Sequence, residues 1–161
     1  MRLYHFTAKE HIESIEEHGL IPKIADGAAA VMTRGIPVVW LTSKPIPAWM
    51  ISAPKEGELV MLTINAKRGR HLIRWAPWLR QTDINIVDEE TGEVIHHHSG
   101  AEIMAALGAS AEPFSGPFIK DAKAGVAALE TYYISTAVIK PRRIIGCAAV
   151  KYDIVETDKV A

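Results

Sequence analysis

The stretch LYHFTAKEHIESIEEHGLIP, residues 3–22, has the pattern of one strand followed by one complete helix. Its apolar run is typical of a short strand over residues 2–6, and Thr7 and Glu10 make the T-x-x-E capping box that starts a helix. Isoleucines three residues apart predict an apolar helix face, and Gly19 predicts the helix end. The chain is therefore expected to open with a strand, a tight turn and a capped helix.

His5 is the residue of this stretch that a strand alone does not explain. It stands inside the apolar run, where a core strand normally has valine or leucine. Taken alone, such a histidine is more often a half-buried structural residue than a functional one. The junction of a strand with a helix N-terminus, however, presents backbone amides and the helix dipole to a polar or anionic ligand. His5 is therefore a candidate for both roles.

The rest of the chain predicts mainly strands. Composition and pattern predict strands at 36–43 and 57–66, a hairpin at 84–97, a short helix at 100–108 and two final strands around the turn at Lys140. The segments 23–35 and 109–125 are loop-rich. Strand and helix do not alternate regularly and no G-x-G-x-x-G follows a strand, which disfavours a doubly wound α/β fold. We expect one α+β domain over 1–161 with mainly antiparallel pairing.

Composition narrows the class of protein. Apolar residues make up 48% and charged residues 23% of 161 residues, which is ordinary for a globular domain. A net charge of −1 argues against binding of nucleic acid through a global positive field. No apolar segment reaches the roughly 18 to 20 residues of a membrane span, and the N-terminus turns polar too soon for a signal peptide, so we expect no membrane contact and cytoplasmic residence. The single Cys147 lies in an apolar strand, which predicts a small buried residue.

Two further places combine polar or aromatic residues with a strand end. Glu130 follows a long Gly/Pro loop and precedes TYYIS, so its carboxylate is expected where a loop meets the rigid scaffold. The alternative is an ordinary exposed glutamate at a strand end. In VVWLTS, Thr42 and Ser43 place two hydroxyls at the strand exit, and Trp40 is either a core residue or an aromatic surface for a ligand.

Taken in order, LYHFT with its helix and GLIP, then VVWLTS, then ETYYIS before a terminal strand pair, resembles the ADP-ribosyltransferase superfamily. The branch with a histidine, an aromatic residue and a glutamate is the most similar, and the opening resembles DNA-targeting ADP-ribosyltransferase toxins and RNA 2'-phosphotransferases. The resemblance implies two packed, mainly antiparallel sheets with a cleft and few helices. It also implies NAD as a substrate and transfer of ADP-ribose to a macromolecular acceptor, either protein or nucleic acid.

The resemblance also implies roles for individual residues. It assigns catalysis to Glu130, the ribose of NAD to His5 and the nicotinamide amide to the backbone around Phe6. The remaining implied NAD-binding residues are Thr7, Arg34, Trp40, Thr42 and Ser43. Trp40 stands where the family commonly has a stacking tyrosine, and Phe6 where it often has glycine. Arg34 is the candidate for the pyrophosphate, and the loop 109–125 is the candidate for acceptor recognition.

The segment KRGRHLIRWAPWLR, residues 67–80, matches nothing in the family pattern. Its cations could bind a phosphate backbone while a tryptophan stacks on a base, or the segment could be amphipathic with its tryptophans in the core. The candidate acceptor contacts are Lys67, Arg68, Arg70, Arg74, Trp75, Trp78 and Arg80. The run HHH at 96–98 does not predict a metal site, because consecutive strand residues cannot all face one ion.

Two alternatives to the transferase stay open from the sequence. One is an enzyme of the RNA 2'-phosphotransferase type, which would use NAD to remove a 2'-phosphate. The other is a catalytically inactive member of the fold that acts as a binding or inhibitor protein. The substitutions at Phe6 and Trp40 favour the second alternative.

Overall fold

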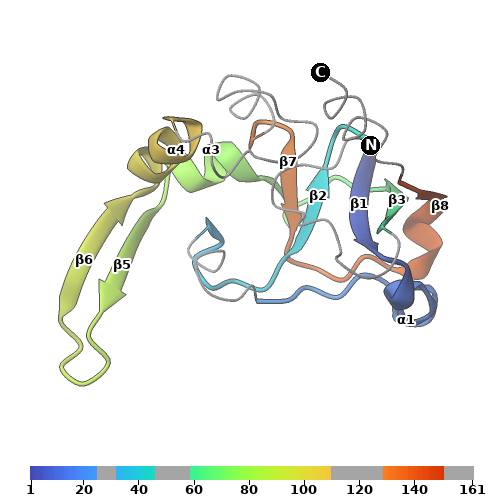
Figure 1. Ribbon diagram of the computed structural model, residues 1–161. Helices are drawn as coiled ribbons and strands as arrows, with labels where there is room; N and C mark the ends of the chain where they lie inside the picture. Colours follow the sequence, from blue (N-terminus) through green and yellow to red (C-terminus); the bar gives the residue numbers. More distant parts are fainter. Residues whose placement is uncertain (25–31, 46–58, 110–128, 151–161) are drawn as a thin grey trace, which may run out of the picture.

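The computed structural model describes residues 1–24, 32–45, 59–109 and 129–150 (Figure 1). Its strands are β1 (Arg2–Ala8), β2 (Val39–Thr42), β3 (Leu59–Asn65), β4 (Leu72–Arg74), β5 (Asp83–Val87), β6 (Val94–Ser99), β7 (Tyr132–Ser135) and β8 (Ile144–Ala149). Its helices are η1 (Lys9–His11), α1 (Ile12–His18), α3 (Trp75–Arg80), α4 (Gly100–Ala109) and η3 (Pro141–Arg143).

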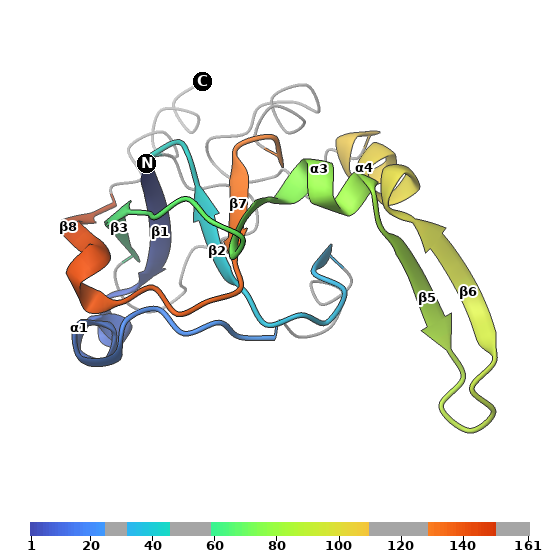
Figure 2. The same ribbon diagram turned by 180° about the vertical axis from the view of Figure 1, so that it is seen from behind.

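Six of the strands form one sheet in the order β4-β7-β2-β1-β3-β8, and every pairing within it is antiparallel. The predicted α+β class with few helices is therefore confirmed. The other two strands, β5 and β6, form the predicted hairpin, which extends away from the sheet beyond α3 and α4 (Figures 1 and 2). In the part of the chain that the structure describes, this arrangement differs from the expected pair of packed sheets.

The sheet buries both of its faces because its central strands are apolar on both sides. One core cluster lies between the sheet and helices α3 and α4. It includes Val38, Trp75, Leu79, Met104, Leu129, Tyr132 and Ile134. The second lies between the sheet and helix α1. It includes Leu3, Ile15, Leu20, Val39, Leu41, Leu62 and Ile64. Alternation along the central strands places neighbouring side chains on opposite faces, as Tyr132 and Tyr133 of β7 show.

Two local predictions were wrong. The T-x-x-E capping box does not form: β1 continues through Thr7, which pairs with Val60, and Ala8 precedes η1 without a side-chain cap. The strand pairing thus keeps the threonine hydroxyl out of the helix N-terminus. Cys147 is exposed rather than buried, because β8 is an edge strand whose residues are mostly exposed.

The helix end at Gly19 was predicted correctly, and the structure shows a second reason for this glycine. Gly19 has a φ of 78°, and a Cβ atom built on it would lie 2.2 Å from the carbonyl oxygen of Ile139. That carbonyl accepts a hydrogen bond of 2.9 Å from the amide of Leu20. The residue therefore needs both the left-handed conformation and the missing side chain.

Gly19→Ala is expected to lower the free energy of unfolding by about 2–4 kcal/mol, through left-handed strain and the clash with a backbone carbonyl. Gly35→Ala is the matched control, since Gly35 has a φ of 69° but nothing within 4 Å of its built Cβ. This control should lose only about 1 kcal/mol. Urea unfolding of both variants measures the difference, and equal losses would show that the contact with Ile139 does not matter.

Candidate functional site

Strands β1 and β2 are neighbours in the sheet but separate almost at once. Their register contains a single pair, Tyr4 with Thr42, whereas β1 pairs with β3 along its whole length from Arg2 to Ala8. Beyond Tyr4, the edge of β1 that faces β2 therefore diverges from its neighbour. A split between two central strands leaves backbone groups that side chains or a ligand must satisfy.

His5 lies at this split and bridges it. Its Nδ1 lies 2.8 Å from the carbonyl oxygen of Trp40 in β2. Because a carbonyl oxygen only accepts, the Nδ1 atom carries the proton and donates it. The imidazole thus supplies the hydrogen bond that a backbone amide of a paired strand would otherwise donate to the Trp40 carbonyl. This role accounts for the histidine inside an apolar strand. In the neutral ring, Nε2 is then an acceptor for a hydroxyl.

The pKa of His5 is lowered from its ordinary value of 6.5. Desolvation by burial is the largest cause, and the charge of Lys23 adds to it, whereas the hydrogen bond to the Trp40 carbonyl acts in the opposite direction. The ring is therefore neutral near pH 7, in the tautomer that the Trp40 carbonyl selects.

This lowered pKa makes stability depend on pH. Between the folded-state pKa and 6.5 the unfolded chain binds more protons at this position than the folded protein does. The free energy of unfolding should therefore fall as the pH drops below about 6.5, and the His5 contribution should level off below the folded-state pKa. Urea unfolding from about pH 8 to about pH 5 checks this, with His5→Asn as the comparison. An identical pH profile for the two proteins would contradict it.

A pocket of about 300 Å³ opens beside His5, between the split strands and α1. Its polar lining includes His5 and Thr7 of β1, His11 and Ser14 near the start of α1, and Lys23. Trp40 also lines the pocket, so three of the predicted NAD-binding residues meet here. Lys23 was missed by sequence reasoning: it follows Pro22 in an irregular segment, and only its paired hydrogen bonds with Val38 bring it to the pocket.

Trp40 also contacts aromatic residues of the core. Its half-buried ring makes edge-to-face contacts with Trp75, at 5.3 Å between centroids, and with Tyr132, at 5.6 Å. These contacts belong to the core cluster on the α3 side. The residue thus joins the core, as the structural alternative predicted, while it also lines the pocket.

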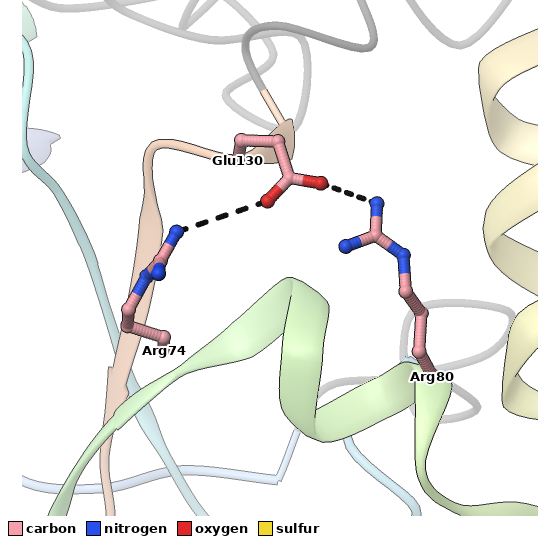
Figure 3. Close-up of polar contacts among 3 residues, drawn as sticks. All are labelled: Arg74, Arg80 and Glu130. Carbon is pink, nitrogen blue, oxygen red and sulfur yellow. Dashed lines mark hydrogen bonds and ion pairs between the residues drawn. The ribbon is translucent and has the colours of Figure 1, made fainter.

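Glu130 lies in the turn before β7, half-buried, between two arginines (Figure 3). One carboxylate oxygen accepts a hydrogen bond from Arg80, at the end of α3, and the other lies 3.9 Å from Nη2 of Arg74. Charge-assisted hydrogen bonds hold this carboxylate between the two guanidinium groups. A polar or charged ligand that binds here can compete for these bonds. Sequence reasoning proposed these arginines as acceptor contacts and did not predict their pairing with Glu130.

Thr42 and Ser43 connect β2 to this second site. The Thr42 hydroxyl donates to the Thr131 hydroxyl at 3.1 Å and accepts from the amide of Lys44, and the amide of Ser43 donates to the Thr131 carbonyl at 2.9 Å. Thr42 is 3% exposed. In this structure both residues therefore hold the turn that carries Glu130 against the exit of β2.

The structure does not place His5 and Glu130 in contact. Tyr4, Thr42 and Tyr132 form one row across β1, β2 and β7, so β2 lies between the strand of His5 and the strand that Glu130 precedes. Two strand spacings correspond to about 10 Å. His5 lies on the α1 side, whereas Glu130 contacts the α3 segment, and Glu130 does not line the His5 pocket. Only an extended ligand could touch both.

No protein-family model, curated protein or solved structure matches this chain. Within the described residues, no group of three or more His, Cys, Asp and Glu side chains could hold a metal ion. Across the same ranges, no helix is both long and apolar enough to cross a membrane.

The remaining predicted site residues lie elsewhere. Phe6 is 8% exposed in β1. Arg34 is exposed in a turn closed by the hydrogen bond from Ile36 to Thr33, with a φ of 55°. The predicted acceptor loop 109–125 lies outside the described residues, apart from Ala109 at the end of α4.

The basic segment 67–80 does not form one continuous surface. Trp75 is fully buried and its indole donates to the carbonyl of Met32 at 2.8 Å, so for this residue the structure agrees with the core alternative and not with base stacking. Trp78 is half-buried against the same core cluster. Arg74 and Arg80 contact Glu130, whereas Arg70 lies in a separate pocket at the other end of β4.

Proposed function

We propose that this protein is an NAD-dependent mono-ADP-ribosyltransferase that modifies a macromolecular acceptor, protein or nucleic acid, and that its sheet is of the ADP-ribosyltransferase type. The observation that carries the proposal is the split between β1 and β2, where His5 is held by the Trp40 carbonyl with Nε2 as an acceptor. Lys23 in the same pocket supplies a cation for a diphosphate. A ribose hydroxyl and a diphosphate are the two groups that such a pocket suits.

Glu130 would act on the other ribose of the same NAD. Breaking the bond between nicotinamide and ribose builds positive charge on the sugar, and a carboxylate aimed at the sugar stabilises that charge and accepts from the 2'-hydroxyl. Nicotinamide leaves as a neutral ring, so no acid is needed. The acceptor atom then bonds to the ribose carbon and loses its proton. Glu130 must partly exchange its contacts with Arg74 and Arg80 for the ribose as NAD binds.

Labelled NAD tests the reaction. Incubation with the protein and a cell extract should transfer label to protein or nucleic acid. Release of nicotinamide without transfer would indicate a hydrolase, and release of a 2'-phosphate from RNA would indicate the phosphotransferase. NAD left intact in every assay would contradict an enzyme and favour the inactive binding protein.

A pair of His5 variants separates binding from structure. His5→Asn keeps a donor near the Nδ1 position and removes Nε2, so it should retain stability while NAD binding weakens by about 3- to 10-fold. His5→Gln places its donor further out and should lose stability, since the Trp40 carbonyl loses its partner. Calorimetric NAD titration and thermal unfolding measure the two effects. Unchanged affinity in His5→Asn would leave His5 with a structural role only.

A further inference from the structure

A second pocket of about 420 Å³ lies at the opposite end of β4 from Glu130, and its polar lining is almost entirely basic. Its apolar base includes Leu41 and Leu72, which belong to or pack on the core cluster of the α1 side. Six lysine and arginine residues line it: Lys67, Arg68, Arg70, Lys140, Arg142 and Arg143. No aspartate or glutamate of the described residues lines this pocket.

These cations come from two segments that are distant in sequence. Pairing of β4 with β7 places Leu72 opposite Ser135, and the amide of Thr136 donates to the His71 carbonyl at 3.0 Å. The residues just before β4 and those after β7 must therefore lie side by side. The segment 67–80 contains only three of the six cations, because the other three follow about 70 residues later in the chain.

The cations of this pocket have no acidic partners in the described ranges. Glu130 pairs with Arg74 and Arg80 outside the pocket, and Glu10 and Glu17 pair with the histidines next to them. The chain as a whole carries a net charge of −1, so six cations around one pocket are a local concentration. Like charges held together without partners are unfavourable unless an anion joins them.

Arg70 shows that the pocket is organised and not merely basic. Its Nε donates to Nε2 of His71 at 3.2 Å, and Nδ1 of His71 lies 3.0 Å from the Thr136 hydroxyl. With Nε2 as the acceptor, Nδ1 donates to the Thr136 hydroxyl. The guanidinium is thus oriented by an imidazole rather than by a carboxylate, and it keeps its charge for a ligand. An arginine oriented in this way suits phosphate oxygens.

We propose that this pocket binds a ligand with several adjacent phosphates, supplied either by a single-stranded nucleic acid or by a nucleoside polyphosphate. The pocket volume lies in the range of small-ligand sites, and its apolar base can accept a base or sugar beside the phosphates. It shares no residue with the His5 pocket, so the proposal does not depend on NAD binding there.

Binding of a fluorescent oligothymidylate of about 12 nucleotides tests the proposal, with ATP, tripolyphosphate and NAD as competitors. The double variant Lys67→Gln with Arg142→Gln should weaken binding about tenfold or more. It should also reduce the slope of log affinity against log salt by about 1.4, because each single-strand phosphate contact contributes about 0.7. Arg2→Gln with Lys9→Gln removes the same charge outside the pocket and is the matched control.

The competitors identify the source of the phosphates. Displacement by ATP or tripolyphosphate at concentrations similar to those of the unlabelled oligonucleotide indicates a nucleotide ligand, and much weaker displacement indicates a nucleic-acid strand. Absence of binding by the oligonucleotide, ATP and tripolyphosphate at about 50 mM salt would overturn the proposal. Equal losses in the test and control variants would do the same. If the first pair lowers the melting temperature, Arg68→Gln with Lys140→Gln repeats the test.

Discussion

Glu130→Gln is expected to lower NAD turnover by on the order of 100-fold or more while folding and NAD binding persist. Glutamine keeps the shape of the side chain and an oxygen for Arg80, but it has no negative charge to stabilise the developing charge on the ribose. The stability change should be small, because the Glu130 side chain is 36% exposed and such ion pairs contribute about 0–1 kcal/mol. Turnover is measured as nicotinamide release under saturating NAD.

Glu13→Gln provides the control, since Glu13 is an exposed carboxylate of α1 and lines neither pocket. It should leave turnover and stability unchanged. Equal turnover in Glu130→Gln and the unmodified protein would remove Glu130 from the catalytic site. Glu130 would then be a residue that joins the turn before β7 to the end of α3.

Trp75→Ala is expected to lower the free energy of unfolding by about 3–5 kcal/mol, which is among the largest effects of a single substitution. Trp75 is 0% exposed and contacts the rings of Trp40 and Tyr132. Its removal leaves a large cavity and leaves the Met32 carbonyl without its 2.8 Å hydrogen bond. Urea unfolding, followed by fluorescence of the remaining tryptophans, gives the change.

Two comparisons divide this effect into its parts. Trp75→Phe keeps an aromatic ring and loses the hydrogen bond, so its loss should be smaller than that of Trp75→Ala. Trp78→Ala should also have a smaller effect, because Trp78 is only half-buried. A loss below about 1 kcal/mol for Trp75→Ala would mean that this ring is not in the core, and base stacking by Trp75 would again be possible.

Much of the fold follows from local sequence pattern. The apolar run 57–66 contains β3 (Leu59–Asn65), the Thr-Gly turn lies between β5 and β6, and the predicted helix 100–108 is α4 with one residue added. The helix end at Gly19 was also predicted, because a glycine that follows an amphipathic helix usually provides the left-handed residue that ends it. These features depend on neighbours within a few residues.

The errors share one physical cause, which is pairing between distant segments. Thr7 does not cap a helix because β3 extends β1 through it, and Cys147 is exposed because β8 lies at the sheet edge. Packing between distant segments likewise decides between the two alternatives for Trp75, which is buried because α3 packs on residues of β7 that follow more than 50 positions later. A reading of the local sequence contains none of this information.

Pairing between distant segments also limits how much of the candidate site the sequence predicts. His5 and Trp40 stand out within their own strands, and the structure joins them by a hydrogen bond. Lys23 was not predicted, because it reaches the pocket only through its bridge to Val38. Lys67 and Arg142 likewise line one pocket, the basic pocket with six lysine and arginine residues, only because β4 pairs with β7.

A crystal structure of Glu130→Gln with NAD bound shows whether the β1 and β2 split is the NAD site. We expect NAD to lie in this split, with one ribose hydroxyl about 2.7–3.2 Å from Nε2 of His5 and the nicotinamide ribose next to residue 130. NAD bound only in the basic pocket, or bound at the split with residue 130 out of reach of the sugar, would contradict it.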